Sequence, residues 1–332
     1  MKKNKILLAI VIVVAALALI FTVVEISGMG KSDTKVEIGI KNGDTFSSIA
    51  GYLKDKGLIG NKTLFKLYVK LTGKNSLKTG TYMLSPSMGY GTLTYSLQNC
   101  ANLMQYKVLI KEGYVISEIA DELEKAGLIN REVFIHLAES GNFDFDFVKK
   151  IERTEHKLEG YLFPDTYLFS KQETEADIIS HMLENFEKNV IPLYEKSGTD
   201  MSLDDVVKLA SVVEKEAANE EEKPKIASVF LNRLKIGKKL ESDATLQYTY
   251  SEKKEELSLN DINKDNPYNT YLNTGLQYSP IAAPGFSSIK AVLYPENTDY
   301  LYFIAAPDGT HSVFSKDFDT HSQYQKEFEK EK

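Results

Sequence analysis

Two stretches of the chain repeat one pattern of residues: IKNGDTFSSIAGYLKDKGLIG, residues 40–60, and IKEGYVISEIADELEKAGLIN, residues 110–130. The second copy starts 70 residues after the first, and isoleucine, glycine, serine, alanine and leucine recur at matching places in both. Each copy predicts a short strand, a glycine turn and an amphipathic helix that is capped by Ser or Thr and ends before a glycine. A βα unit used twice therefore organises this part of the chain.

The first βα unit resembles the LysM module, which binds N-acetylglucosamine polymers. Residues 77–100 predict a further strand and helix that complete this unit. A single duplication is too short for a solenoid. Two similar units packed together only for stability explain the repeat equally well, so a glycan-binding and a purely structural role both remain open.

The N-terminus predicts a membrane anchor. Residues 6–24, ILLAIVIVVAALALIFTVV, carry no charge and are long enough to span a bilayer as a helix. Lysines at positions 2, 3 and 5 precede this segment, so the positive-inside rule places the N-terminus in the cytoplasm and the rest outside. The alternative is a cleaved signal peptide, but VEISGMGKSD at residues 24–33 does not end in a small-residue cleavage motif.

Composition excludes several other functions for this 332-residue chain. Its net charge of −7 disfavours a nucleic-acid partner, and its single cysteine, Cys100, forms no intrachain disulfide. There is no glycine-rich phosphate loop. The histidines lack metal-binding spacing, so neither a metal nor a cofactor is expected; they are His136, His156, His181, His311 and His321.

The C-terminal part of the sequence predicts an α+β fold. Helical patterns cover residues 174–194 and 203–218, and a third helix with acidic residues in its first turn stops at Gly237. Residues 300–315 predict a β-hairpin around PDGT. The predicted organisation is a cytoplasmic N-terminus (1–5), a transmembrane helix (6–24), a linker (25–35), a LysM-like subdomain (36–105) and a catalytic region (106–332).

Two glutamates end the helical stretch LASVVEKEA, residues 209–217. At about 100° per residue, Glu216 continues the apolar stripe of Leu209, Val212 and Val213, whereas Glu214 points to a more polar side. Desolvation raises the pKa of a carboxyl, and an acid of raised pKa can donate a proton near neutral pH. Spacing alone leaves a second explanation, in which Glu216 merely ends the helix and pairs with a lysine.

Six motifs occur in a fixed order along the chain: LEGYLFPDTY, LASVVEKEA, IASVFLNRLKIGKKLESDATLQY, PYNTYLNTGL, SPIAAPG and LYFIAAPDGTHSVFSKDFDTH. Together they resemble the endolytic murein transglycosylase family, also called the YceG-like family, from about Val36 to the C-terminus. A lone VEKE would be a weak signal, but six long ordered motifs are specific. Within the first motif, GYLFPDTY also has a structural explanation, as packing at a domain junction.

The resemblance implies a lytic transglycosylase that acts on peptidoglycan and places the family's catalytic glutamate at Glu216. In this chemistry one acid protonates the oxygen that leaves the MurNAc-β-1,4-GlcNAc bond, and the MurNAc C6 hydroxyl closes a 1,6-anhydro ring. Peptidoglycan synthases are the protein partners implied. The candidate sugar contacts are Asn232, Asp243, Thr245, Gln247, Tyr268, Asn269 and Thr270.

Each of these sugar contacts also has a structural explanation, such as a helix cap at Asp243 or a turn at PYNT. One departure from the family pattern is Gln277–Tyr278, where many members have two prolines; this puts a loop shape in doubt and leaves the chemistry unaffected.

Two other functions remain open. A lysozyme-like hydrolase needs a second acid, for which Asp243 and Glu214 are the candidates. A glycan-binding scaffold without catalysis needs no acid at Glu216, so the glutamate there counts against it.

Overall fold

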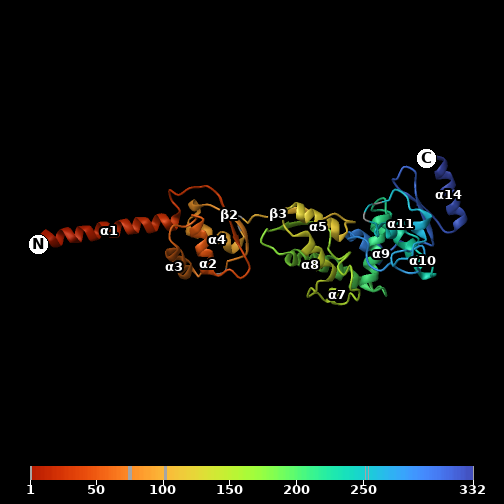
Figure 1. Cartoon of the computed structure of the whole chain (residues 1–332), viewed down its shortest axis with the longest axis horizontal. Coiled ribbons are helices and arrows are strands. Elements are labelled where there is room, and N and C mark those ends of the chain that lie inside the picture. Colours follow the sequence, from red (N-terminus) through yellow and green to blue (C-terminus); the bar gives the residue numbers. More distant parts are fainter. Residues whose placement is uncertain (1, 74–76, 101–102, 251, 253, 332) are drawn as a thin grey trace. The chain divides into compact units, whose positions relative to one another are not determined.

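The computed structural model describes residues 2–73, 77–100, 103–250, 252 and 254–331 (Figure 1). The chain forms two compact units, Met1–Lys107 with Leu168–Thr174, and Val108–Tyr167 with Glu175–Lys332. Helices and short antiparallel strands occur in both units, which confirms the α+β prediction.

The first unit is built around a two-stranded antiparallel sheet. Strand β1 pairs with β2, and Ile38 and Ile40 of β1 face a core that Leu53, Phe65 and Tyr90 also enter. Its elements are α1 (Lys2–Ser27), β1 (Val36–Ile40), α2 (Phe46–Asp55), α3 (Lys62–Thr72), β2 (Gly80–Leu84), a 3-10 turn η1 (Pro86–Met88) and α4 (Gly89–Asn99).

Helix α1 provides the apolar segment. Ile6–Ser27 is long and apolar enough to cross a membrane by length and composition, and it runs three residues beyond the predicted span. Glu25 is buried at its end, where it accepts hydrogen bonds from Gly60 N and Tyr90 Oη, both at 2.9 Å, and pairs with Lys31 at 2.9 Å. The start of the predicted linker is thus helical and fixed to the first unit.

The two repeats form the predicted strands, turns and helices, with one difference in capping. In the first copy the Thr45 side chain caps α2 by accepting a hydrogen bond from Ser48 N. In the second copy Val115 occupies the cap position, so the predicted Ser or Thr cap is wrong there. Glu118 reaches back instead and accepts from Val115 N at 2.9 Å.

The second unit is mostly helical. It contains α5 (Ile116–Lys125), α6 (Arg131–Ser140), α7 (Asp146–Lys149), α8 (Glu175–Ser197), α9 (Leu203–Glu216), α10 (Lys223–Lys235), α11 (Asp243–Gln247), α12 (Leu259–Ile262), α13 (Phe286–Leu293), the hairpin β5 (Tyr302–Ala305) and β6 (Ser312–Ser315), and α14 (Phe318–Glu331). Strands β3 (Tyr106–Leu109) and β4 (Thr166–Phe169) pair with each other, and the boundary between the units falls within both strands.

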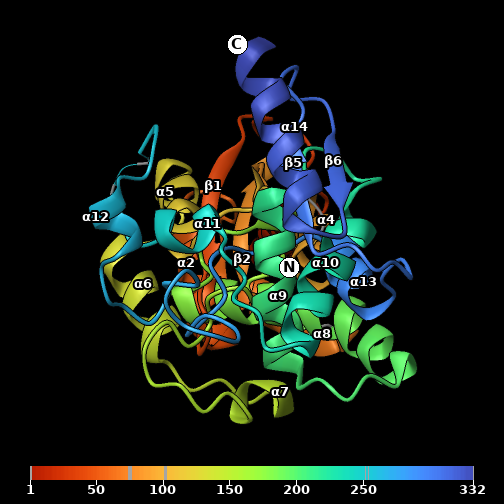
Figure 2. The same ribbon diagram turned by 90° about the vertical axis from the view of Figure 1, so that its right-hand side faces the viewer.

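Helix α9 occupies the core of the second unit. It packs against α10, α11 and α13, and α8 in turn packs against α13 (Figure 2). Five of its apolar residues are fully buried, each contributing about 1.5–3 kcal/mol relative to exposure: Val206, Val207, Leu209, Val212 and Val213. The helix begins at the capping side chain of Ser202 and ends at Glu216. Its C-terminal end therefore has a fixed position.

Candidate active site

A cavity of about 960 Å³ opens at the C-terminal end of α9, within the second unit. Glu216 lines it from α9, and Asp243, Gln247 and Tyr248 line it from α11 and the residue that follows. The other wall comes from Ile116 of the second repeat, Glu139 of α6, His156 and Glu159 of the segment after α7, and Tyr268. A glutamate at the end of a buried helix thus faces an open, mixed polar and aromatic space.

Glu216 is enclosed by protein while part of its surface faces the cavity. Its Oε1 accepts a hydrogen bond of 2.5 Å from the Ser242 hydroxyl. Burial raises the pKa of Glu216, and the nearby Asp243 carboxylate raises it further, against the lowering effect of the Ser242 hydrogen bond. This direction agrees with the raised pKa predicted from the apolar stripe, and such a carboxyl can hold a proton for donation.

Two of the candidate sugar contacts fix Ser242 in place. The Thr245 hydroxyl donates to Ser242 O at 2.8 Å, and Thr270 Oγ1 accepts from Ser242 N at 3.1 Å. Both threonines are buried, and neither lines the cavity. Their geometry therefore supports the residue that binds Glu216.

The remaining candidates divide into two groups. Asp243, Gln247 and Tyr268 line the cavity together with Glu216. Asn232 instead donates to Thr298 O and Tyr300 O, and Asn269 donates to Ile262 O and Lys264 O. These two asparagines hold backbone segments in place and lie outside the cavity lining, as their structural explanation predicted.

Glu214 was expected on a more polar side of α9, but its side chain is only 9 % exposed. It accepts from Gly285 N at 2.9 Å and from the Ser288 hydroxyl at 2.6 Å, and it pairs with Lys223 at 3.3 Å. Lys223 is itself buried and also pairs with Glu220 at 2.5 Å. Glu214 is therefore a structural anion, because a buried charge needs a partner of opposite sign.

Glu159, Glu139 and His156 line the cavity although no sequence motif pointed to them as site residues. Glu139 Oε1 lies 2.9 Å from Nδ1 of His156, and this contact raises the pKa of His156 and lowers that of Glu139. Burial raises the pKa of Glu159 to about 7. A signal was present in LEGYLFPDTY, where Glu159 directly precedes GYLFPDTY, the stretch that was interpreted as packing at a domain junction.

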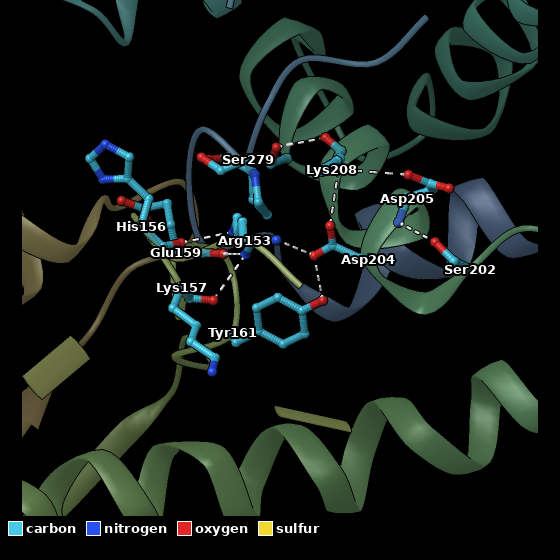
Figure 3. A network of polar contacts seen from close by, with 12 residues as sticks. Arg153, His156, Lys157, Glu159, Tyr161, Ser202, Asp204, Asp205, Lys208 and Ser279 are labelled. Carbon is cyan, nitrogen blue, oxygen red and sulfur yellow. Dashed lines mark hydrogen bonds and ion pairs between the residues drawn. The ribbon is translucent and has the colours of Figure 1, made fainter. Parts of the chain in front are cut away.

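The segment that carries Glu159 is fixed to α9 by Arg153 (Figure 3). The Arg153 guanidinium forms a short ion pair with Asp204 and donates to the carbonyl oxygens of His156 and Lys157, both at 3.0 Å. Although burial opposes ionisation of Asp204, Arg153 and Lys208 lower its pKa.

Gly160 follows Glu159 and has a φ of +84°. A Cβ atom there would lie 2.5 Å from Pro280 and 2.9 Å from Val207. Only glycine fits, so the loop passes close against α9.

Comparisons with known proteins agree on one family. The model of the YceG-like family matches residues 38–327. An endolytic murein transglycosylase of Bacillus subtilis is 33 % identical over 310 residues, which cover 90 % of this chain and 86 % of the relative. An endolytic murein transglycosylase of Streptococcus pneumoniae is 30 % identical over 297 residues; the match covers 81 % of this chain but only 54 % of that relative.

A crystal structure of a YceG-like protein from Listeria monocytogenes has the same fold. It is 33 % identical, with a TM-score of 0.58, and the match covers 88 % of this chain and 99 % of that one.

Substitution of the two glutamates of α9 should lower the free energy of unfolding by different amounts. Glu214→Ala removes one partner of a buried ion pair and should lower the free energy of unfolding by about 3 kcal/mol. Glu216→Gln keeps an acceptor for Ser242 and should lower it by less than ~1 kcal/mol. Denaturant titration of both variants checks this, with Glu195→Ala on the exposed side of α8 as the control. Equal stability of Glu214→Ala and Glu195→Ala would contradict the structural role of Glu214.

Proposed function

Because the chain belongs to the YceG-like family, we propose that it is an endolytic murein transglycosylase, an enzyme that cleaves the glycan strands of peptidoglycan. It is a lyase, and peptidoglycan is its substrate. The observation that carries the proposal is Glu216: an enclosed carboxyl of raised pKa at the end of a rigid helix, facing a cavity wide enough for sugar rings.

Glu216 acts first as an acid and then as a base. Its proton passes to the oxygen that leaves MurNAc C1 as the MurNAc-β-1,4-GlcNAc bond breaks. The resulting carboxylate accepts the proton of the MurNAc C6 hydroxyl, whose oxygen bonds to C1 and closes the 1,6-anhydro ring. The carboxyl is regenerated and no water is consumed, so one acid suffices where a hydrolase uses two.

Cavity position supports Asp243, Gln247 and Tyr268 as sugar contacts. Thr245 and Thr270 hold Ser242 in place through hydrogen bonds to its backbone. The Ser242 hydroxyl in turn donates a hydrogen bond to Glu216. A neutral donor suits this role, since a cation there would lower the pKa of the acid.

We propose that α1 anchors the chain in the membrane and that the second unit is extracytoplasmic. The lysines before α1 favour a cytoplasmic N-terminus, and peptidoglycan lies on the other side of the membrane. A reporter fused after Ser32 is expected to be extracytoplasmic and membrane-bound. Substrate strands emerge from peptidoglycan synthases at the same surface, so the proposal includes these enzymes as partners; crosslinking in intact cells tests it.

The first prediction from this function concerns the acid itself. Glu216→Gln should lower turnover by at least ~10²–10⁴-fold, the usual loss for a general acid–base group, while the fold persists. Mass spectrometry of digested sacculi checks both rate and chemistry, because anhydro ends weigh one water less than reducing ends.

Three results would contradict the proposal. Products with reducing ends would indicate a hydrolase. Glycan strands left uncut by the unaltered chain would indicate a scaffold. Normal anhydro products from Glu216→Gln would exclude this residue as the acid. Glu222→Gln, a buried carboxyl outside the cavity, is the matched control.

The second prediction concerns the first unit, which we propose to be a LysM-like module. It has a smaller hollow of about 350 Å³ lined by Tyr52, Asp44 and Lys41, with Tyr52 partly exposed. Deleting residues 36–100 should weaken binding to sacculi several-fold while cleavage of short strands persists. Unchanged binding would leave this unit as a spacer or a protein-docking surface.

A further inference from the structure

Glu159 is a buried carboxyl of the cavity that the proposed chemistry does not use. Its Oε2 accepts hydrogen bonds from Tyr248 Oη at 3.0 Å and from Ile116 N at 3.3 Å. Within the described part of the chain, its Oε1 is buried without a hydrogen-bond partner. A buried carboxyl with one unpaired oxygen lowers the stability of a fold. Its presence in the cavity wall therefore indicates a functional role for Glu159.

The position of Glu159 is set by the fold. Arg153 binds the carbonyl oxygen of Glu159 at 3.3 Å as well as Asp204 of α9, and Figure 3 shows this link between the loop and the helix. Gly160 allows the close approach to Pro280. The loop has little freedom to move Glu159 away from Tyr248.

Helix α11 is tied to a cavity carboxyl at each end. Ser242, which precedes the helix, donates to Glu216, and Tyr248, which follows it, donates to Glu159. A change in the bond to Tyr248 therefore acts on the same short helix whose cap contacts Glu216.

Tyr248 is also part of an aromatic wall. Its ring lies 5.0 Å from that of Tyr268 and 6.0 Å from that of His156, and all three residues line the cavity. Tyrosine presents an apolar ring face beside a polar hydroxyl, which suits the C–H faces and hydroxyl groups of a pyranose. This wall is the natural surface for one sugar ring of a bound strand.

We propose that Glu159 is a positioning residue for glycan binding: by ionising, it tightens its hold on Tyr248 and fixes the Tyr248–Tyr268 wall against a sugar ring. The inference rests on the proposed function, because it takes a glycan strand as the ligand of the cavity.

Ionisation of Glu159 falls in the physiological range. Burial raises its pKa to about 7, against the lowering effects of Ile116 N–H, Tyr248 Oη–H and His156, while Glu139 raises it further. Tyr268 and Arg153 are the other titratable or charged neighbours of Glu159. Below about pH 7 the carboxyl is neutral, and above it the carboxylate accepts a charge-assisted hydrogen bond from Tyr248, roughly twice as strong. Affinity for glycan should therefore rise with pH through about 7.

Binding of a soluble MurNAc–GlcNAc oligomer to the full chain in detergent, measured by calorimetry from pH 5.5 to 8.5, tests the proposal. The Glu216→Gln chain is the reference, since it neither cleaves the ligand nor titrates at Glu216. Its Kd should fall about fivefold as pH rises through about 7. Adding Glu159→Gln, which keeps an acceptor for Tyr248 but cannot ionise, should abolish this pH dependence.

Three further variants separate positioning from a merely structural role. Tyr248→Phe keeps the ring and loses the hydroxyl, so it should also remove the pH dependence, and it serves if Glu159→Gln does not fold. Glu222→Gln alters a second buried carboxyl whose Oε2 has no hydrogen-bond partner among the described residues, and His156→Asn removes the neighbouring imidazole. Both should retain the pH dependence, with its midpoint at higher pH in His156→Asn, because His156 lowers the pKa of Glu159.

Any of three results would overturn the inference. These are a pH dependence that persists in Glu159→Gln and Tyr248→Phe, a pH dependence that is lost in His156→Asn alone, and failure of the reference chain to bind the oligomer. Cleavage by the unaltered chain is assayed separately. A chain that binds as expected but releases no product would refute the proposed enzyme and leave Glu159 as a positioning residue.

Discussion

Burial of helix α9 on nearly every side is the constraint on which the second unit depends. Where such a helix is enclosed by protein, a charged residue on it is not hydrated and needs a partner within the protein. Asp204 at its start pairs with Arg153, and Glu214 near its end pairs with Lys223. These two ion pairs fix the ends of α9 to the loop before β4 and to α10.

Glu216 differs from Glu214 in the kind of partner that it has. Glu214 faces a lysine and two donors, which together compensate its charge. Glu216 faces the neutral hydroxyl of Ser242, with the Asp243 carboxylate nearby. Two residues apart on one helix, the first is paired with a buried lysine and the second is biased toward its protonated form by burial. This division assigns a structural role to one and makes the other available for proton transfer.

Sequence periodicity predicted what depends on local rules. The repeated strand, turn and helix, the α9 stripe and the C-terminal hairpin follow from spacing, caps and turn residues, and the structure contains all of them. The raised pKa of Glu216 follows from its place on that stripe. The cap at Val115 was predicted wrongly, because the side chain of Glu118 replaced a Ser or Thr cap.

Local rules of spacing, caps and turn residues did not predict the contacts between segments that are distant along the chain. Glu214 meets Gly285, and Glu159 meets Tyr248, only after segments remote in sequence have folded together. For the same reason, Asn232 and Asn269 could not be separated from Asp243 as candidates until their backbone partners were known.

Proton donation by Glu216 depends on a pKa that lies above that of an ordinary glutamate. Carbon-13 NMR titration of labelled glutamate carboxyls, with the Glu216 signal assigned by its loss in Glu216→Gln, measures this property in the absence of substrate. We expect the titration midpoint of Glu216 to lie clearly above the ordinary glutamate value of 4.5. A midpoint at or below that value would show that Ser242 and the solvent stabilise the anion, and it would remove the physical basis for Glu216 as the proton donor.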